Sequence, residues 1–354
     1  MKVVGRVAVV GQLHHDIFEG EQHPWVDLEG QMQVEWAAAP FLRMQVDFPR
    51  LSQRVGLDEV TLVVHVEAVV DRVVLQFGHE TGDVDHCHPA TIGAGRAGPR
   101  TTVARVNDDA VLAVLHDAAT AVGAVLEGLP DWGLAGTRAG QYRSDLAADA
   151  AALAVLERAG FGVLSEESGL HHGDRPVVVV LDPVDGSTNA AHGLPWFATS
   201  LCAVDASGPL AAVVVNQATG VRYEAVRGGG ARRDGRAIRP SAVTMLDEAL
   251  VGLSGLPPAH LGWRQFRALG AAALDLCAVA EGALDGYVDC LADAHGPWDY
   301  LGGMLVCLEA GAAVADAGGR DLVALEHGAR RTPVAAASAG LLEQLLASRN
   351  RLLA

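Results

Sequence analysis

Lysine is almost missing from this chain. Its 354 residues include one lysine, Lys2, and its 26 basic residues stand against 43 acidic ones, for a formal net charge of −17. Broad nucleic-acid binding is not expected, because it needs a basic surface that displaces counterions from phosphates. A protein this acidic can hold a phosphate group only where a metal ion or backbone amides offset the repulsion.

Cysteines are few and odd in number, and long apolar runs are also missing. The five cysteines are scattered along the chain: Cys87, Cys202, Cys277, Cys290 and Cys307. Scattered cysteines are typical of reduced, mostly buried thiols, so we expect a cytoplasmic protein without a disulfide framework. The histidines beside Cys87 have no partner pair with zinc-like spacing, which argues against a structural zinc site. No segment reaches the roughly 18 consecutive apolar residues of a membrane span, so we expect no membrane partner.

The composition changes near residue 100. Half of the residues are hydrophobic and the mean hydropathy is +0.22, which indicates a globular chain with room for two or three packed units. We predict an N-terminal extension over residues 1–102, followed by the two halves of one α/β unit, residues 103–240 and 241–354. The extension is rich in histidine and has two interpretations: a segment read through from a wrongly chosen start, or a metal-binding module.

The most informative segment lies near the middle of the chain. Residues 177–181 (VVVVL) are short, β-branched and uninterrupted, which predicts a strand buried on both faces. Pro183 cannot donate to a sheet ladder, so we expect strand pairing to stop there. Asp182 and Asp185 then follow the strand, at the usual ligand position of open α/β sheets.

Two carboxylates this close repel each other unless a cation lies between them. Magnesium suits the pair, because it takes oxygen ligands and shares phosphate oxygens of a substrate. Gly186, Ser187 and Thr188 come next and can present backbone N–H groups to an anion at a helix start. Taken alone, the same residues also fit an ordinary capped turn. The spacing of the two aspartates excludes a haloacid-dehalogenase-type site, where one residue separates them.

Helical patterns surround this segment. A helix is expected from residue 107 or 108, and Asp145 is expected to cap a second helix that ends before Gly160. An alanine-rich helix is predicted over residues 265–281. Another is predicted over residues 298–310, with Asp299 near its start, where the helix dipole favours a carboxylate. For Asp299 alone, a plain capping residue is the alternative.

Three motifs together resemble the inositol monophosphatase family of magnesium-dependent, lithium-sensitive phosphatases. They are residues 182–189 (DPVDGSTN), residues 298–303 (WDYLGG) with 309–311 (EAG), and residues 165–168 (SEES). The resemblance covers roughly residues 105–354. It implies an α/β fold of the layered α-β-α-β-α sandwich type, two or three Mg²⁺ ions, and homodimers.

The resemblance also implies roles for individual residues. The implied metal ligands are Glu166, Asp182, the backbone carbonyl of Val184, Asp185 and Asp299. The implied residues around the attacking water are Glu166, Ser187 and a supporting Asp149. The implied substrate contacts are Gly186, Ser187, Thr188, Asp289, Gly270, Ala271 and Ala272. In addition, the family has a lysine in the loop before residue 145; here Arg138 or Arg143 is the candidate replacement.

These residues lead us to expect a hydrolase that cleaves a phosphate monoester by attack of a metal-activated water. Its partner would be a small phosphate ester, and inositol monophosphate or a similar sugar or polyol phosphate is favoured. Fructose 1,6-bisphosphate, histidinol phosphate and nucleotide 3′-phosphates are the alternatives within the same fold. An alternative of another class is a non-catalytic binding protein that keeps the fold.

Overall fold

In the computed structural model the chain divides into two compact units, Met1–Val103 and Ala104–Ala354. The structure describes residues 108–138 and 140–353, and in the first unit only strand backbones. The first-unit strands are β1 (Gly5–Ala8), β2 (Gly11–Leu13), β3 (Val26–Leu28), β4 (Gln31–Trp36), β5 (Leu42–Val46), β6 (Thr61–Val64), β7 (Leu75–Phe77) and β8 (His88–Ala90). The expectations for Cys87 and for a histidine-rich metal module concern side chains outside the described residues.

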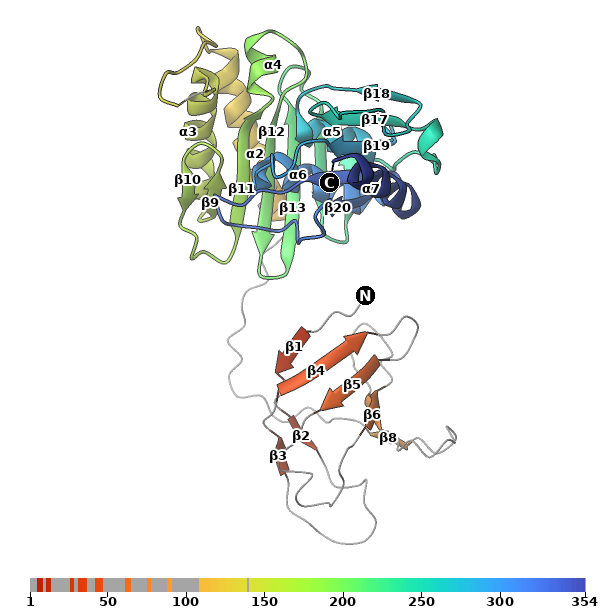
Figure 1. The fold of residues 1–354 in the computed structure, drawn as a ribbon. Coiled ribbons are helices and arrows are strands. Elements are labelled where there is room, and N and C mark those ends of the chain that lie inside the picture. Colours follow the sequence, from red (N-terminus) through yellow and green to blue (C-terminus); the bar gives the residue numbers. More distant parts are fainter. Residues whose placement is uncertain are drawn as a thin grey trace, which may run out of the picture. The chain divides into compact units, whose positions relative to one another are not determined.

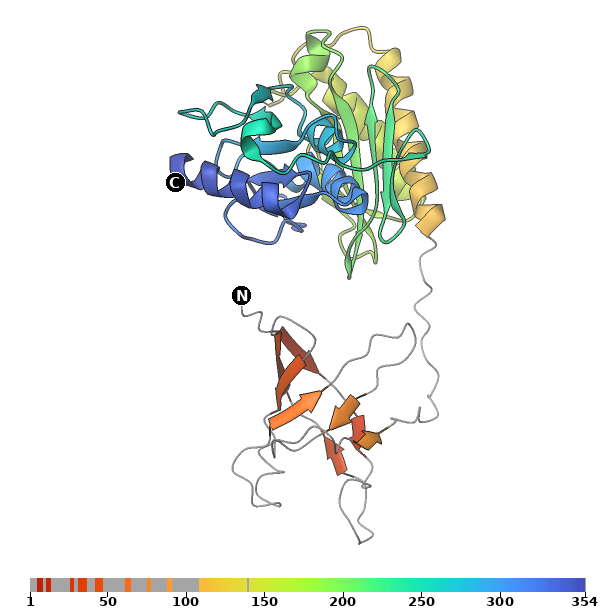
Figure 2. The ribbon, with the colours of Figure 1, turned by 90° about the vertical axis from the view of Figure 1, so that its right-hand side faces the viewer.

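The second unit has five layers, which confirms the predicted layered α/β sandwich (Figures 1 and 2). Its helices are α2 (Asp108–Glu127), α3 (Arg143–Arg158), α4 (Ser187–Ala191), α5 (Ala272–Ala280), α6 (Pro297–Ala310) and α7 (Ala339–Leu353). Helices α2 and α3 cover one face of an eight-stranded sheet. Helices α5 and α6 lie between that sheet and a five-stranded sheet, whose outer face is covered by α7.

Two strand sets form these sheets, and each comes from one part of the chain. The eight-stranded sheet has the order β10 (Gly169–His171), β9 (Gly162–Ser165), β11 (Val178–Asp185), β12 (Ala198–Asp205), β13 (Gly208–Asn216), β14 (Arg222–Val226), β15 (Gly230–Arg233) and β16 (Arg236–Ala237). The five-stranded sheet has the order β18 (Gln265–Arg267), β17 (Leu250–Ser254), β19 (Gly286–Asp289), β21 (Pro333–Ala336) and β20 (Ala313–Asp316). A short 3₁₀ helix, η1 (Leu246–Glu248), precedes β17.

Helix α2, which begins where the sequence predicts a helix, buries one apolar face. Its buried residues are Val111, Leu115, Ala118, Ala119, Val122 and Leu126. By length and composition alone α2 could cross a membrane, the one such helix among the described residues. This face packs on α3 and β13, however, as in a helix that covers a sheet.

Strand β11 is buried along its whole length, as predicted, but its pairing does not stop at Pro183. Asp182 pairs with Ser200 of β12 and Asp185 pairs with Ala198, so two residues of β11 stand opposite Thr199 in a bulge. The Thr199 hydroxyl donates to the Pro183 carbonyl at 2.9 Å, and Pro183 sits where no ladder N–H is needed. The bulge places Asp182 and Asp185 at the end of the strand.

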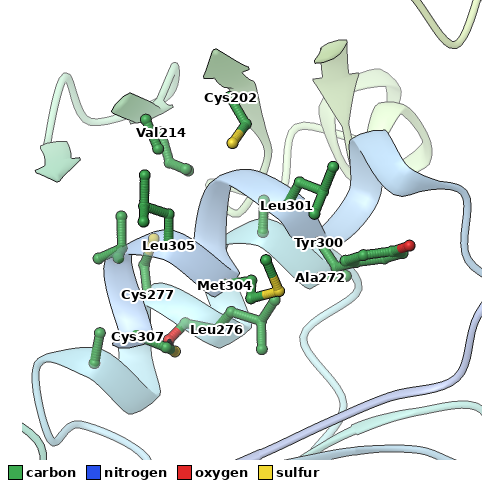
Figure 3. Packing of buried hydrophobic residues seen from close by; sticks show 14 of the residues in the cluster. Cys202, Val214, Ala272, Leu276, Cys277, Tyr300, Leu301, Met304, Leu305 and Cys307 are labelled. Atoms are coloured by element: carbon green, nitrogen blue, oxygen red, sulfur yellow. Dashed lines mark hydrogen bonds between the residues drawn. The ribbon is translucent and has the colours of Figure 1, made fainter. Parts of the chain in front are cut away.

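Helix α6 lies in close contact with layers on both sides (Figure 3). A Cβ atom added at Gly302 would lie 2.6 Å from Ser200 Oγ, and one added at Gly303 would lie 2.6 Å from Leu276 Cβ. The two glycines therefore let α6 fit between β12 and α5. This fit fixes the start of α6, where Asp299 lies.

The predicted helix over residues 265–281 is wrong at its beginning. Gln265–Arg267 forms the edge strand β18, and the helix starts only at Ala272, after a turn in which Gly270 has φ +88°. A glycine at positive φ breaks a helical pattern that composition alone does not reveal. Among the described cysteines, Cys202, Cys277, Cys290 and Cys307 are free and buried, as predicted.

Candidate metal centre and active site

Three carboxylates from separate elements converge on one point. Glu166 follows β9, Asp182 lies near the end of β11, and Asp299 is the third residue of α6. One oxygen of each lies within 4.8 Å of an oxygen of the other two. Carboxylates at this spacing form a set of hard oxygen ligands for a divalent cation.

Local hydrogen bonds hold each of the three in place. Asp182 Oδ1 accepts the Val184 N–H at 3.0 Å, inside the bulge. Asp299 Oδ2 accepts the Gly296 N–H at 2.7 Å, which caps α6. The Glu166 N–H donates to the Leu181 carbonyl at 3.1 Å. Backbone N–H groups therefore hold the carboxylates of Asp182 and Asp299, and a backbone hydrogen bond fixes the chain at Glu166.

The cluster is electrostatically costly without a cation. Burial, and then the charge of Asp299, raises the pKa of Glu166 to about 8. Burial, and then the charge of Asp185, raises the pKa of Asp299 to about 8. The pKa of Asp182 also lies well above its usual value, because of burial and the neighbouring Glu166. A cation bound among them would offset this repulsion, so the residues present fit a metal ion.

Asp185 and Val184 lie beside this cluster. The Asp185 carboxylate accepts the Ala273 N–H at 2.7 Å through Oδ2, and burial raises its pKa to about 8. Asp185 is therefore hydrogen-bonded to the start of α5, and its charge also acts on Asp299. Val184 is buried in the bulge next to Asp182. The ligand roles of both residues stay predictions.

The turn after Asp185 meets a second turn from far along the chain. Gly186 has φ +84° and begins α4, so the N–H groups of Ser187 and Thr188 lie in the first turn of that helix. Asn189 Nδ2 donates to the carbonyls of Trp196 and Leu269, at 2.8 and 2.7 Å. This brings the predicted Gly270–Ala272 backbone next to the predicted anion cradle.

Replacing Gly186 with alanine tests this close packing. An added Cβ would lie 3.0 Å from the Gly270 carbonyl oxygen and 3.1 Å from that of Trp196, at a positive φ. We expect Gly186→Ala to lower the free energy of unfolding by about 1–3 kcal/mol and to weaken inhibition by inorganic phosphate. Urea unfolding and phosphate inhibition measure the two effects.

Gly193→Ala is the matched control. Gly193 also has a positive φ, +72°, but an added Cβ meets nothing within 4 Å. In the control, the free energy of unfolding should fall only by the cost of placing alanine at a positive φ, about 1 kcal/mol. Inhibition by phosphate should be unchanged. Equal losses in both variants would show that the contact with Gly270 does not matter.

The supporting aspartate differs from the prediction. Asp149 accepts a hydrogen bond from the Ser165 hydroxyl, not from Ser187, so it stabilises the end of β9. Asp145, four residues earlier, is the aspartate whose charge acts on Glu166 and Asp182. It is not the cap itself but the third residue of α3, and it accepts the Tyr142 N–H at 2.8 Å. Its place in the site is not evident from the sequence, because α3 starts earlier than the pattern predicts.

Arg138 is the better of the two candidate replacements for the family's loop lysine. It pairs with Glu167 at 2.9 Å, next to Glu166, and its charge favours the ionised form of Glu166. Arg143 instead pairs with Asp131. Opposite them, His327 Nε2 lies 3.0 Å from the Glu166 carbonyl oxygen, and the Arg330 guanidinium lies over the Trp298 ring.

A cavity of about 190 Å³ opens beside the carboxylates. Its lining residues are Asp185, Leu253, Ser254, Gly270, Ala271, Ala272, Asp275, Tyr287, Ala294, His295 and Asp299. A larger open groove, of about 540 Å³, lies along the C-terminal half of α6 and contains none of the predicted site residues. The smaller cavity is therefore the candidate substrate pocket.

Asp289 does not line this pocket. Its side chain is fully buried, with Oδ1 accepting the Leu291 N–H at 2.9 Å and Oδ2 lying 3.2 Å from His295 Nδ1. The predicted contact with a substrate hydroxyl is therefore not available to Asp289 in this structure. The loop between Asp289 and α6 turns the side chain inward, which spacing along the sequence does not reveal.

Comparison with known proteins shows which family has this sequence and fold. A model of the inositol monophosphatase family matches residues 110–353. The chain belongs to this family. An inositol-1-monophosphatase from Mesorhizobium japonicum is 36% identical over 185 residues, which cover 47% of this chain and 67% of that protein. A fructose-1,6-bisphosphatase from Pyrococcus furiosus is 33% identical over 174 residues, which cover 48% and 67%.

The fold agrees with that of solved inositol monophosphatases. The structure of inositol monophosphatase from Anabaena (Nostoc) sp. PCC 7120 superposes with a TM-score of 0.59 and 27% sequence identity. The match covers 70% of this chain and 98% of that one. Membership makes the chain a phosphoric monoester hydrolase of a generally metal-dependent family. The candidate acidic site of Glu166, Asp182 and Asp299 is consistent with that dependence.

Proposed function

We propose that this inositol monophosphatase family member is a magnesium-dependent hydrolase of monophosphate esters of uncharged polyols, with inositol monophosphate as the favoured substrate. The convergence of Glu166, Asp182 and Asp299 within 4.8 Å carries the proposal. Acidic side chains that repel one another persist in a fold when a cation binds between them.

Two or three Mg²⁺ ions would be held by Glu166, Asp182, Asp185, Asp299 and the carbonyl of Val184. Bound there, they would supply charge that polarises the phosphoryl oxygens and acidifies a water molecule. Glu166 is half-buried and is the proposed acceptor of the water proton. The Ser187 hydroxyl would orient that water, and Asp145 would take the supporting position that the resemblance implies for Asp149.

The lining of the substrate pocket favours an uncharged alcohol. Among its lining residues there is no lysine or arginine. His295 does not supply a charge either, because burial, and then the charge of Arg330, lowers its pKa to about 4. A second phosphate group would therefore face Asp275 and Asp185, whereas Arg330, whose charge acts on His295 and Asp299, lies outside the lining. This argues for a monophosphate over fructose 1,6-bisphosphate.

A phosphate-release assay tests the proposal. The panel contains inositol 1-phosphate, fructose 1,6-bisphosphate, histidinol phosphate, a nucleotide 3′-phosphate and p-nitrophenyl phosphate, each with and without Mg²⁺. We expect Mg²⁺-dependent release with the highest kcat/KM for inositol 1-phosphate, and inhibition by Li⁺. Faster release from the bisphosphate would reject the argument from the pocket lining. No release from any ester, with tight phosphate binding, would support a non-catalytic role.

Two further expectations are proposals of the same kind. A homodimer follows from the family resemblance, and analytical ultracentrifugation of the full chain tests it. A cytoplasmic location follows from the free, buried thiols at Cys202, Cys277, Cys290 and Cys307.

A further inference from the structure

One buried carboxylate beside the pocket has no role in the metal site described above. Asp275 lies in the first turn of α5, is 2% exposed and lines the candidate substrate pocket. It forms one hydrogen bond, in which the Trp196 indole Nε1 donates to Oδ1 at 2.9 Å. Buried carboxylates are rare without a partner for each oxygen, because their desolvation is costly.

Asp275 lines the same pocket as Asp185, which lies at the carboxylate cluster, and Tyr287. Burial raises the pKa of Asp185 and that of Tyr287, and the charge of Asp275 adds to both shifts. Trp196, which donates to Asp275, also contacts helix α4 after Gly186, because the Trp196 carbonyl accepts a hydrogen bond from Asn189. A group esterified to a phosphate at the carboxylate cluster would enter the pocket that Asp275 lines.

The structure assigns to Asp275 the recognition of a hydroxyl group on the polyol, with Trp196 as the residue that positions it. This inference rests on the proposed function and adds the residue that recognises the alcohol part of the substrate. Because Trp196 occupies Oδ1, the second oxygen, Oδ2, is the one left to bond a substrate hydroxyl. A hydrogen bond to a buried carboxylate is of the strong, charge-assisted kind.

Two other polar side chains of the pocket lining are already engaged, and His295 Nδ1 is buried there without a hydrogen-bond partner. Asp185 Oδ2 accepts the Ala273 N–H at 2.7 Å, and the Tyr287 hydroxyl lies 3.0 Å from His295 Nε2. Asp289, the acidic residue that the sequence favoured for this task, lies outside the lining and is fully buried. The described pocket lining contains three carboxylates, Asp185, Asp275 and Asp299. Asp185 and Asp299 are proposed metal ligands, so Asp275 is the one left to bind the alcohol.

Asp275→Asn tests the assignment with little change of shape. The amide keeps an oxygen for Trp196 and replaces the acceptor at the second position with a donor. We expect the ratio of kcat/KM for inositol 1-phosphate to kcat/KM for p-nitrophenyl phosphate to fall about 10- to 100-fold. Trp196→Phe, which removes the indole N–H together with part of the ring, should lower the same ratio by less.

Asp285→Asn is the matched control. Asp285 is also a buried aspartate of this half of the chain, bonded to Ser241 and to the Leu250 N–H, and it is not part of the pocket lining. The control should lower the melting temperature and leave the substrate ratio unchanged. A fall of the ratio in both variants would mean that general destabilisation, and not hydroxyl recognition, explains the result.

Monodeoxy inositol phosphates give a second measurement. For the wild-type enzyme, kcat/KM for one of these analogues should be about 10-fold or more below that for inositol 1-phosphate. For Asp275→Asn, the same analogue and inositol 1-phosphate should differ little, as expected if the missing hydroxyl contacts Asp275. Equal losses in both enzymes for every analogue would overturn the assignment. If the wild-type enzyme hydrolyses p-nitrophenyl phosphate but the ratio survives the substitution, only this inference fails. If it hydrolyses no ester with Mg²⁺, the proposed function fails and the inference with it.

Discussion

Asp182→Asn should abolish magnesium-dependent turnover, with kcat/KM reduced by about 10³-fold or more. Asp182 is 2% exposed, and one of its carboxylate oxygens lies within 4.8 Å of an oxygen of both Glu166 and Asp299. The amide keeps the oxygen that accepts the Val184 N–H, so we expect the bulge in β11 to persist. Phosphate release at saturating Mg²⁺ measures the loss.

The same substitution should stabilise the metal-free protein near neutral pH. It removes one of the buried groups whose mutual repulsion raises their pKa values. Loss of activity together with an unchanged or higher melting temperature separates a missing ligand from a failed fold. Asp205→Asn, which breaks an ion pair with Arg227 away from the cluster, is the control and should keep turnover. Near-normal activity of Asp182→Asn would reject the site.

The convergence of the three carboxylates could be predicted because they lie next to strong local patterns. Glu166 and Asp182 come at the ends of buried strands, and Asp299 opens a helix whose glycines, Gly302 and Gly303, allow close packing. A local pattern marks each of these three segments, and the layered fold brings them together. Three segments far apart in the chain thus met as expected from the resemblance.

The substrate end of the site could not be predicted in the same way. It depends on side-chain direction in loops and on exact helix starts, which sequence patterns determine poorly. Asp289 points into the core instead of the pocket, and Asp275 was read only as part of an alanine-rich helix. Likewise, α3 begins two residues before Asp145. The aspartate whose charge acts on Glu166 is therefore Asp145 and not Asp149.

Stability of the metal-free protein should fall as pH rises, and Mg²⁺ should reverse the fall. In the folded state the pKa values of Glu166, Asp185 and Asp299 are raised to about 8, from 4.5, 3.8 and 3.8, mainly by burial. A raised pKa means that the folded state binds protons more tightly than the unfolded state. The stability from these groups is therefore complete below about pH 4 and is lost as pH rises toward about 8.

His295 opposes this trend at acid pH, so the test belongs above neutrality. Its pKa is lowered from 6.5 to about 4, and the stability it contributes is lost as pH falls below its usual value. Between about pH 6.5 and 8.5 the carboxylates dominate. Calorimetry of the full chain without metal should then show the transition of the second unit moving to lower temperature as pH rises.

Magnesium should raise that melting temperature most at the alkaline end, because protons no longer compete for the carboxylates. At a concentration about 100 times its Kd, the gain should be roughly 5–10 °C. Asp182→Asn should show a much smaller gain, whereas the Asp205→Asn control should respond like the wild-type protein. An equal magnesium effect at pH 5.5 and 8.5, or a metal-free protein that grows more stable with pH, would mean that the carboxylates do not form one cation site.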